Sequence, residues 1–136
     1  MNGGAVLEGG CLCGAVRYRV EGAPFDAEYC HCRMCQRFTG AAAANWMDFK
    51  RELVTFSAGE VREYASSEHV RRGFCAQCGS ALSFRDTRYP QFYTLTIASL
   101  DQPNAVRPTR HLFTDSRLEW FDPNDDCPRF PRGPGP

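Results

Sequence analysis

The chain has 136 residues, a length that predicts one domain with a modest hydrophobic core. Lys plus Arg and Asp plus Glu number 16 each, and this balance disfavours a dedicated nucleic-acid binder, a class that usually carries a basic excess. No apolar run approaches the ~20 residues of a membrane-spanning helix, so we expect neither nucleic acid nor a membrane as a partner.

The first eight residues, MNGGAVLE, have neither the basic nor the apolar stretch of a secretion signal. We therefore expect a cytoplasmic protein, whose thiols are kept reduced. In that compartment paired cysteines indicate metal ligands before disulfides. The alternative is a disulfide-rich secreted domain.

Residues 5–21 predict a β-hairpin. Apolar and charged side chains alternate from Val16 to Glu21, which is the period of a half-buried strand. Cys11 and Cys13 lie in this hairpin, and in an extended chain residues two apart point to the same side. Both thiols can therefore reach one metal ion.

Short apolar, β-branched or aromatic segments predict further strands along the chain. They are residues 25–29, 41–44, 53–56, 61–64, 70–74, 81–84, 92–97 and 110–113. The segment 92–97 is the richest in β-branched and aromatic residues and predicts a central strand. Residues 36–39 predict a helical turn that Gly40 ends, and residues 48–52 predict a short turn or helix. The pattern indicates a mainly all-β fold with one or two short helical turns.

The carboxyl-terminal residues 127–136 are rich in proline and glycine and lack core-forming side chains, a composition that predicts a disordered tail. No repeat or linker divides the remainder. We therefore expect a single zinc domain over residues 1–126.

Seven of the eight cysteines fall into three short clusters, and only Cys127 stands apart. The clusters are Cys11 with Cys13, Cys30 with Cys32 and Cys35, and Cys75 with Cys78. Spacings of two and three residues let neighbouring thiolates point at one thiophilic metal ion. The clusters predict two zinc ions per chain, one held by four thiolates and one by three.

The four-thiolate site is predicted from the C-x-x-C-G knuckle at Cys75 and Cys78, combined with Cys11 and Cys13. In such a knuckle the chain curls so that both sulfurs face the metal, and Gly79 supplies the positive φ that closes the turn. The alternative for an isolated C-x-x-C is a redox pair, but no βαβ pattern surrounds this one. We expect these four cysteines to hold a structural zinc ion.

Cys30, Cys32 and Cys35 remain, and three thiolates leave the fourth position of a tetrahedral zinc open, as in a reactive site. His31 or Cys127 could fill that position instead, or Cys30 could form a disulfide in the absence of metal. His31 lies between two ligands and would point away from them in an extended segment. A surface or hydrogen-bonding role suits it better.

Several arginines lie near the clusters in sequence and could offset thiolate charge or hold the carboxylates of a ligand, the alternative being solvated surface positions. They are Arg17, Arg33, Arg37, Arg71 and Arg72, with Arg33 and Arg37 the first candidates for carboxylate contacts. Phe38, Trp46 and Tyr93 are candidates for lining a pocket, or for the core. His31 and His111 are candidates for a general acid or base.

The order of these motifs resembles one family, the glutathione-dependent formaldehyde-activating enzymes (GFA). The resemblance rests on residues 10–18, 30–37 and 72–80, with further similarity at 64–67, 98–101 and 111–113, and it spans about residues 8–122. It implies a β-tent, in which small antiparallel sheets are clipped together by zinc. It also implies that Cys11, Cys13, Cys75 and Cys78 hold the structural ion, and that Cys30, Cys32 and Cys35 hold the ion of the active site.

The activity implied by the resemblance is carbon–sulfur lyase chemistry, which joins glutathione and formaldehyde or separates their adduct. The partner would then be a small thiol or thiol adduct. The competing hypothesis is a non-catalytic zinc-stabilised module that binds a small thiol or a protein, and a third is a redox or metal-storage protein. A binding module would need the four-thiolate site but would have no use for three thiolates with a free position.

Overall fold

The computed structural model describes residues 5–134, and within this range it is built mainly of strands. The strands are β1 (Val6–Gly10), β2 (Arg17–Glu21), β3 (Asp26–Cys30), β4 (Ala44–Lys50), β5 (Val54–Ala58), β6 (Arg62–Ala65), β7 (Val70–Phe74), β8 (Ala81–Asp86), β9 (Phe92–Thr96) and β10 (Arg110–Leu112). One helix, α1 (Arg33–Thr39), and four 3₁₀ turns, η1 (Arg51–Leu53), η2 (Ile97–Ser99), η3 (Pro103–Ala105) and η4 (Thr114–Ser116), complete them. The mainly-β fold class predicted from the sequence is confirmed.

The strands form two sheets, with the orders β1-β2-β5 and β10-β3-β4-β9-β8-β7-β6. Strand β9 lies inside the larger sheet, as its composition predicts. All but one of the strand pairs are antiparallel. The exception is β10, which runs parallel to β3 with His111 opposite Tyr29. The expected antiparallel pairing therefore holds for every strand pair except the one at this edge.

One hydrophobic core joins the two sheets. Tyr18 and Val20 of β2 pack with Met47 and Phe49 of β4 and Leu95 of β9, and all five side chains are fully buried. Successive side chains of a strand point to opposite faces. The even-numbered residues of β3, β4 and β9 therefore face away from this core, toward a second compartment.

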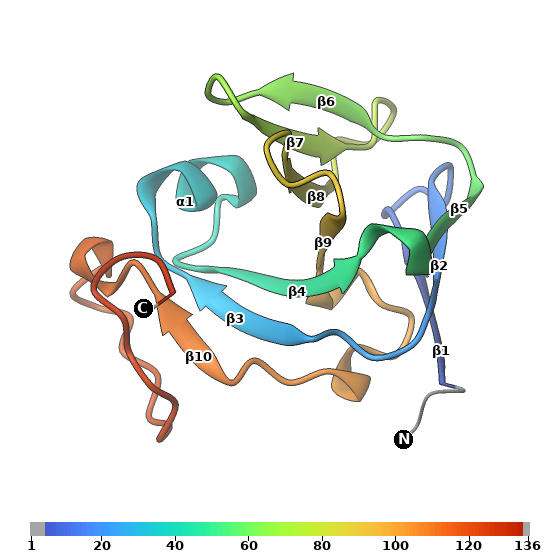
Figure 1. Ribbon diagram of the computed structural model, residues 1–136. Coiled ribbons are helices and arrows are strands. Elements are labelled where there is room, and N and C mark those ends of the chain that lie inside the picture. The colour runs from blue at the N-terminus through green and yellow to red at the C-terminus, as the bar shows by residue number, and fades with distance from the viewer. Residues whose placement is uncertain (1–4, 135–136) are drawn as a thin grey trace.

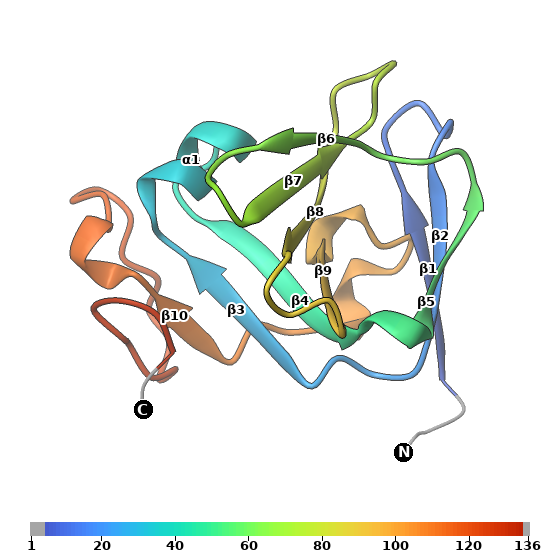
Figure 2. The same cartoon turned by 45° about the horizontal axis from the view of Figure 1, so that its top comes forward.

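That second compartment lies inside the curl of the larger sheet. Figures 1 and 2 show β6 and β7 at one end of the sheet and β3 and β10 at the other, with α1 beside the opening between them. Because α1 follows β3 after two residues, its first turn is placed directly at the end of that strand. This arrangement brings the helix and both ends of the sheet around one hollow.

The helix and strand β4 differ in detail from the expected elements. The helix ends at Gly40, whose φ of 72° allows its N–H to reach the Gln36 carbonyl, as predicted. Residues 41–43, expected in a strand, instead lie in a bend, because the Gln36 amide and the Thr39 hydroxyl bind their backbone groups. Residues 48–50, expected in a turn, belong to β4.

Residues 127–134, for which the composition predicts a disordered tail, lie alongside β10. The His111 N–H donates to the Pro128 carbonyl at 2.8 Å, and the Phe130 N–H donates to the His111 carbonyl at 2.9 Å. Composition alone misses this pairing, since the open edge of β10 offers backbone groups that a proline-rich segment can still use. Positions 135 and 136 lie outside the described residues. Over residues 5–134 no helix has the length and hydropathy that a bilayer crossing requires.

Candidate functional site

Four thiols meet where the β1–β2 turn approaches the β7–β8 turn. The Sγ atoms of Cys11 and Cys13 are 3.7 Å apart, and those of Cys13 and Cys75 are 3.8 Å apart, with Cys78 in the same group. A tetrahedral zinc ion with bonds of about 2.3 Å requires sulfurs about 3.8 Å apart. The donor set and its spacing therefore fit a zinc ion, and this cluster could hold a metal that ties the small sheet to the large one.

Local hydrogen bonds prepare this cluster for a cation. The Val16 N–H donates to Cys11 Sγ at 3.2 Å, and Ser80 Oγ lies 3.2 Å from Cys78 Sγ. The Ser80 hydroxyl is the main cause that lowers the pKa of Cys78 to about 5. Gly79 has a φ of 80°, as the knuckle motif predicts. Thiolate, the form that binds metal, is thus favoured at Cys78 before any ion arrives.

Three further thiols meet at the junction of β3 and α1. Cys30 ends β3, Cys32 is the N-cap of α1, and Cys35 lies in its first turn, with all three sulfurs within 4.8 Å of one another. Hydrogen bonds from Cys32 and Cys35 raise the pKa of Cys30, whereas a hydrogen bond from Cys30 lowers that of Cys32. The thiols therefore compete for protons, and a cation is needed for all three to be ionised together. This donor set also fits zinc.

His31 and Cys127, the two alternative candidates for a fourth ligand, do not belong to the three-thiol cluster. The eight cysteines all lie within the described residues, and each is a free thiol. Cys127 Sγ points to the Pro108 carbonyl and belongs to neither group of potential ligands. His31 turns away from its neighbours Cys30 and Cys32, as the sequence indicates, and is completely buried.

His31 instead belongs to a buried hydrogen-bonded chain behind the three thiols. Its Nε2 lies 2.9 Å from His111 Nδ1, and His111 Nε2 lies 3.0 Å from Asp125 Oδ2. A carboxylate can only accept, so His111 Nε2 carries the proton and its Nδ1 accepts from His31. His31 Nδ1 is then an acceptor, and it has no partner among the described residues. Neither histidine lines the pocket, so neither predicted acid or base faces a ligand there.

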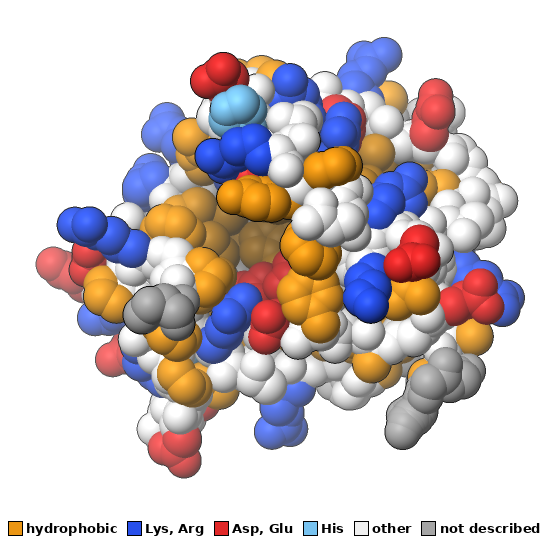
Figure 3. All heavy atoms as spheres, viewed as in Figure 1, with side chains coloured by type: hydrophobic (Ala, Val, Ile, Leu, Met, Phe, Trp, Pro, Cys, Tyr) orange, Lys and Arg blue, Asp and Glu red, His pale blue; other side chains and the backbone are white. Residues whose placement is uncertain are grey.

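The three thiols open onto a cavity of about 580 Å³. Figure 3 shows the hollow, with hydrophobic side chains around it and acidic ones inside. The strand residues that line the cavity are all even-numbered. Residues two apart on a strand point to the same side, and the strands pair even positions with even positions, so these side chains share one face of the curled sheet. They are Glu28, Cys30, Trp46, Asp48, Val70, Arg72, Phe84, Thr94, Arg110 and Leu112. Trp46 lines the cavity, but Tyr93 lies in the core and Phe38 stacks on Trp46 from outside the lining.

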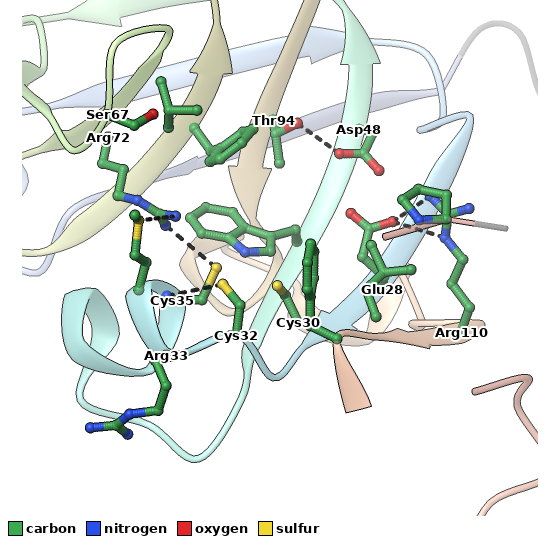
Figure 4. A pocket seen from close by; sticks show the side chains of 17 residues that line it. Glu28, Cys30, Cys32, Arg33, Cys35, Asp48, Ser67, Arg72, Thr94 and Arg110 are labelled. Atoms are coloured by element: carbon green, nitrogen blue, oxygen red, sulfur yellow. Dashed lines mark hydrogen bonds and ion pairs between the residues drawn. The ribbon is translucent and has the colours of Figure 1, made fainter. Parts of the chain in front are cut away.

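Arg72 is the basic residue that contacts the three-thiol cluster. Its side chain is buried, and Nη1 donates to Cys35 Sγ at 3.4 Å (Figure 4). The guanidinium group lies 5.7 Å from the ring centre of Phe38 and 5.2 Å from that of Phe84. The sequence analysis includes Arg72 among the candidate arginines but gives Arg33 and Arg37 as the first candidates for carboxylate contacts. Arg33 lines the cavity while bound to Gln36 Oε1 at 2.6 Å, and Arg37 does not line it.

A pair of acidic residues that the sequence analysis missed faces the other side of the cavity. Figure 4 shows the carboxyl groups of Glu28 and Asp48 turned toward one another. Burial, followed by the neighbouring Asp48, raises the pKa of Glu28 to about 9, although Arg110 donates to it at 2.9 Å and opposes that rise. Burial also raises the pKa of Asp48, against hydrogen bonds from Glu28 and Thr94. Burial thus favours the protonated form at both carboxyl groups.

The contact with Cys35 leads to a prediction for Arg72→Met, a change that keeps a long apolar side chain but removes the positive charge. We expect the three-thiol cluster to lose its metal about tenfold more readily, because sulfur charge is no longer offset by the buried guanidinium. The rate of metal transfer to a chromogenic chelator measures this effect. The same change at exposed Arg62 is the control, and equal rates for the two variants would contradict the assigned role of Arg72.

Fold and site together define a mainly-β protein with two thiol clusters suited to metal ions, one of them opening onto a cavity. Residues 6–116 match the sequence model of the family described as glutathione-dependent formaldehyde-activating enzyme. The chain belongs to this family.

Individual relatives agree with this assignment. A Halomonas elongata protein provisionally named as a glutathione-dependent formaldehyde-activating enzyme is 30% identical over 126 residues, covering 86% of this chain and 80% of its own. An uncharacterised lyase of Schizosaccharomyces pombe is 30% identical over 80 residues, covering 59% of this chain and 58% of its own. A crystal structure of a Rhodobacter sphaeroides protein has the same fold, with a TM-score of 0.58 at 23% identity over 90% of this chain and 99% of that one.

Proposed function

We propose that this chain is a zinc-dependent carbon–sulfur lyase that forms or cleaves the adduct of a small thiol and an aldehyde. The observation that carries the proposal is the opening of the Cys30, Cys32 and Cys35 cluster onto a cavity with largely apolar walls. Family membership supports the reaction class, and glutathione with formaldehyde is the first pair to test. The protein would hold two zinc ions, a structural one at Cys11, Cys13, Cys75 and Cys78 and a catalytic one at the open cluster.

The reaction requires a sulfur nucleophile and a place for one proton. In the forward direction the thiol sulfur bonds to the carbonyl carbon, the C=O π electrons move to oxygen, and the thiol proton ends on that oxygen. Cleavage reverses each of these changes. Zinc bound by three thiolates would lower the pKa of an added thiol and stabilise the sulfur as a leaving group.

The surrounding side chains create the conditions for this chemistry. Arg72 donates to Cys35 Sγ and offsets the negative charge of the cluster. Trp46, Phe84 and Leu112 give the cavity apolar walls that limit the access of water, and this strengthens electrostatic interactions within it. These contacts are expected of a reactive site, and a protein whose thiols remain reduced would work in the cytoplasm.

The alternative of a non-catalytic zinc-stabilised module receives less support. Such a module would account for the four-thiol cluster that joins the two sheets. It gives no reason for a buried arginine directed at a second cluster, or for a cavity onto which that cluster opens.

The thiol site is tested by calorimetry of the zinc-loaded protein. We expect a small thiol to bind with release of about one proton, seen as a heat that depends on the ionisation enthalpy of the buffer. Cys32→Ser should abolish this binding while leaving α1 intact, because serine can replace the thiol as N-cap acceptor for the Cys35 N–H. Failure of every thiol in a panel, glutathione included, to bind with proton release would exclude the proposed site.

A further inference from the structure

The basic side chains that line the cavity already have protein partners. Arg72 binds Cys35 and the Ser66 hydroxyl, and Arg33 binds the Gln36 side chain. Arg110 donates twice to Glu28 Oε1, at 2.9 and 3.1 Å. Arg72 and Arg110 are therefore held by partners within the cavity, and the guanidinium group of Arg33 points away from the three thiols (Figure 4).

The acidic side of the cavity has hydrogen-bond acceptors that no protein group within residues 5–134 uses. Asp48 Oδ1 accepts from Thr94 Oγ1 at 2.7 Å, and its other oxygen faces Glu28 (Figure 4). A carboxylate offers about four lone-pair sites, so Asp48 can accept further hydrogen bonds. A donor on the ligand would satisfy these oxygens, whereas another carboxylate would be repelled by them.

Strand geometry sets the distance between the two ends of the cavity. Glu28 and Cys30 are two residues apart on the same face of β3, which separates them by about 7 Å. An extended chain covers about 3.4 Å for every three bonds, so about six bonds between sulfur and donor span this distance. The surface between the ends is apolar, with Trp46, Phe84 and Leu112 in the lining.

We infer that this cavity selects thiols with an apolar body ending in a neutral hydrogen-bond donor that reaches Asp48, and that it discriminates against thiols bearing carboxylates, glutathione among them. The inference rests on the proposed function, since it assumes that the ligand sulfur binds at the three-thiol cluster. The substrate would then be an apolar hydroxy-thiol or its aldehyde adduct.

The test compares thiols of matched length on the zinc-loaded protein by calorimetry. The probes are 5-mercaptopentan-1-ol, hexane-1-thiol and 5-mercaptopentanoic acid, with glutathione as a fourth. We expect the alcohol to bind about tenfold more tightly than the acid, because a hydrogen bond to a charged acceptor contributes about 1.5 kcal/mol. It should also bind more tightly than hexane-1-thiol, which lacks the donor, and than glutathione.

Asp48→Asn supplies the matched variant, since the amide keeps the shape and removes the negative charge. The preference for the alcohol over the acid should fall to about twofold or less, while Asp122→Asn, outside the cavity lining, should leave it unchanged. If Asp48→Asn fails to fold, the comparison of ligands on the unchanged protein decides alone. Glutathione or the acid binding as tightly as the alcohol, or a preference that survives in Asp48→Asn, would overturn the inference while leaving the thiol site in place. Absence of binding by all four thiols would overturn both proposals.

Discussion

Cys75→Ser is expected to destabilise the folded chain by about 5 kcal/mol or more, lowering the melting temperature by about 15 °C. Cys75 is buried in the contact between the two sheets, where it packs with Cys11, Val16 and Leu82. A metal site that forms only in the folded chain contributes its binding free energy to folding. Serine would remove one of four ligands and place a hydroxyl in an apolar contact.

Cys32→Ser provides the comparison, because it removes one ligand of the other cluster at a half-buried position. Its melting temperature should stay within about 4 °C of the unchanged protein, since the N-cap hydrogen bond is retained. Differential scanning calorimetry measures both changes. Elemental analysis should find two zinc ions per chain before substitution and about one in Cys32→Ser.

Equal destabilisation by the two substitutions would contradict the division into a structural and a reactive metal site. Metal-free protein, purified under reducing conditions and already at full stability, would contradict both sites. A single ion lost on treatment with a weak chelator, with no change in melting temperature, would support the division.

The two thiol clusters could be predicted from the sequence because much of their spacing is local. Cys75 and Cys78 form a knuckle whatever surrounds them, and the Cys30 to Cys35 segment brings its thiols together within one strand end and one helical turn. Cys11 and Cys13 of the first hairpin could be assigned to the same site as Cys75 and Cys78 only because a closed zinc site needs four ligands. The Sγ distance of 3.8 Å between Cys13 and Cys75 agrees with that pairing.

The acidic pair could not be found in this way, because its members are joined by sheet register. Glu28 and Asp48 lie on different strands and look like solvent-facing positions in a half-buried pattern. Their burial depends on the curl of the larger sheet, which turns this face into the wall of a cavity. The sequence did contain one signal for Glu28. It stands two residues before the predicted ligand Cys30, and residues two apart on a strand share one face.

The position of residues 127–134 beside β10 could not be predicted for a related reason. These residues have little side-chain hydrophobicity, and their contacts are backbone hydrogen bonds to β10 and ion pairs such as Arg129 with Asp125 at 2.8 Å. Both depend on a sheet edge that is formed by distant residues. Composition indicates whether a segment can form a hydrophobic core. It does not show whether an open sheet edge lies near enough to pair with that segment.

His111→Phe is expected to destabilise the protein by about 3 kcal/mol, or roughly 10 °C in melting temperature. Phenylalanine would keep the stacking on Tyr29, whose ring centre lies 4.7 Å away, but would remove the hydrogen bonds to His31 and Asp125. The His31 N–H would then be buried without an acceptor, directly behind Cys30 and Cys32. An unpaired buried donor costs about 1–3 kcal/mol.

His69→Phe is the matched control, because this histidine is partly exposed and lies outside the chain of buried hydrogen bonds. It should change the melting temperature by no more than about 2 °C. His111→Phe should also increase hydrogen exchange of the Phe130 N–H, which is bonded to the backbone of residue 111, because the Asp125 contact helps to hold the segment 127–134 in place. Unchanged stability and unchanged exchange in His111→Phe would show that the C-terminal segment is held by its backbone pairing alone, and that the three-thiol cluster needs no support from the histidine pair behind it.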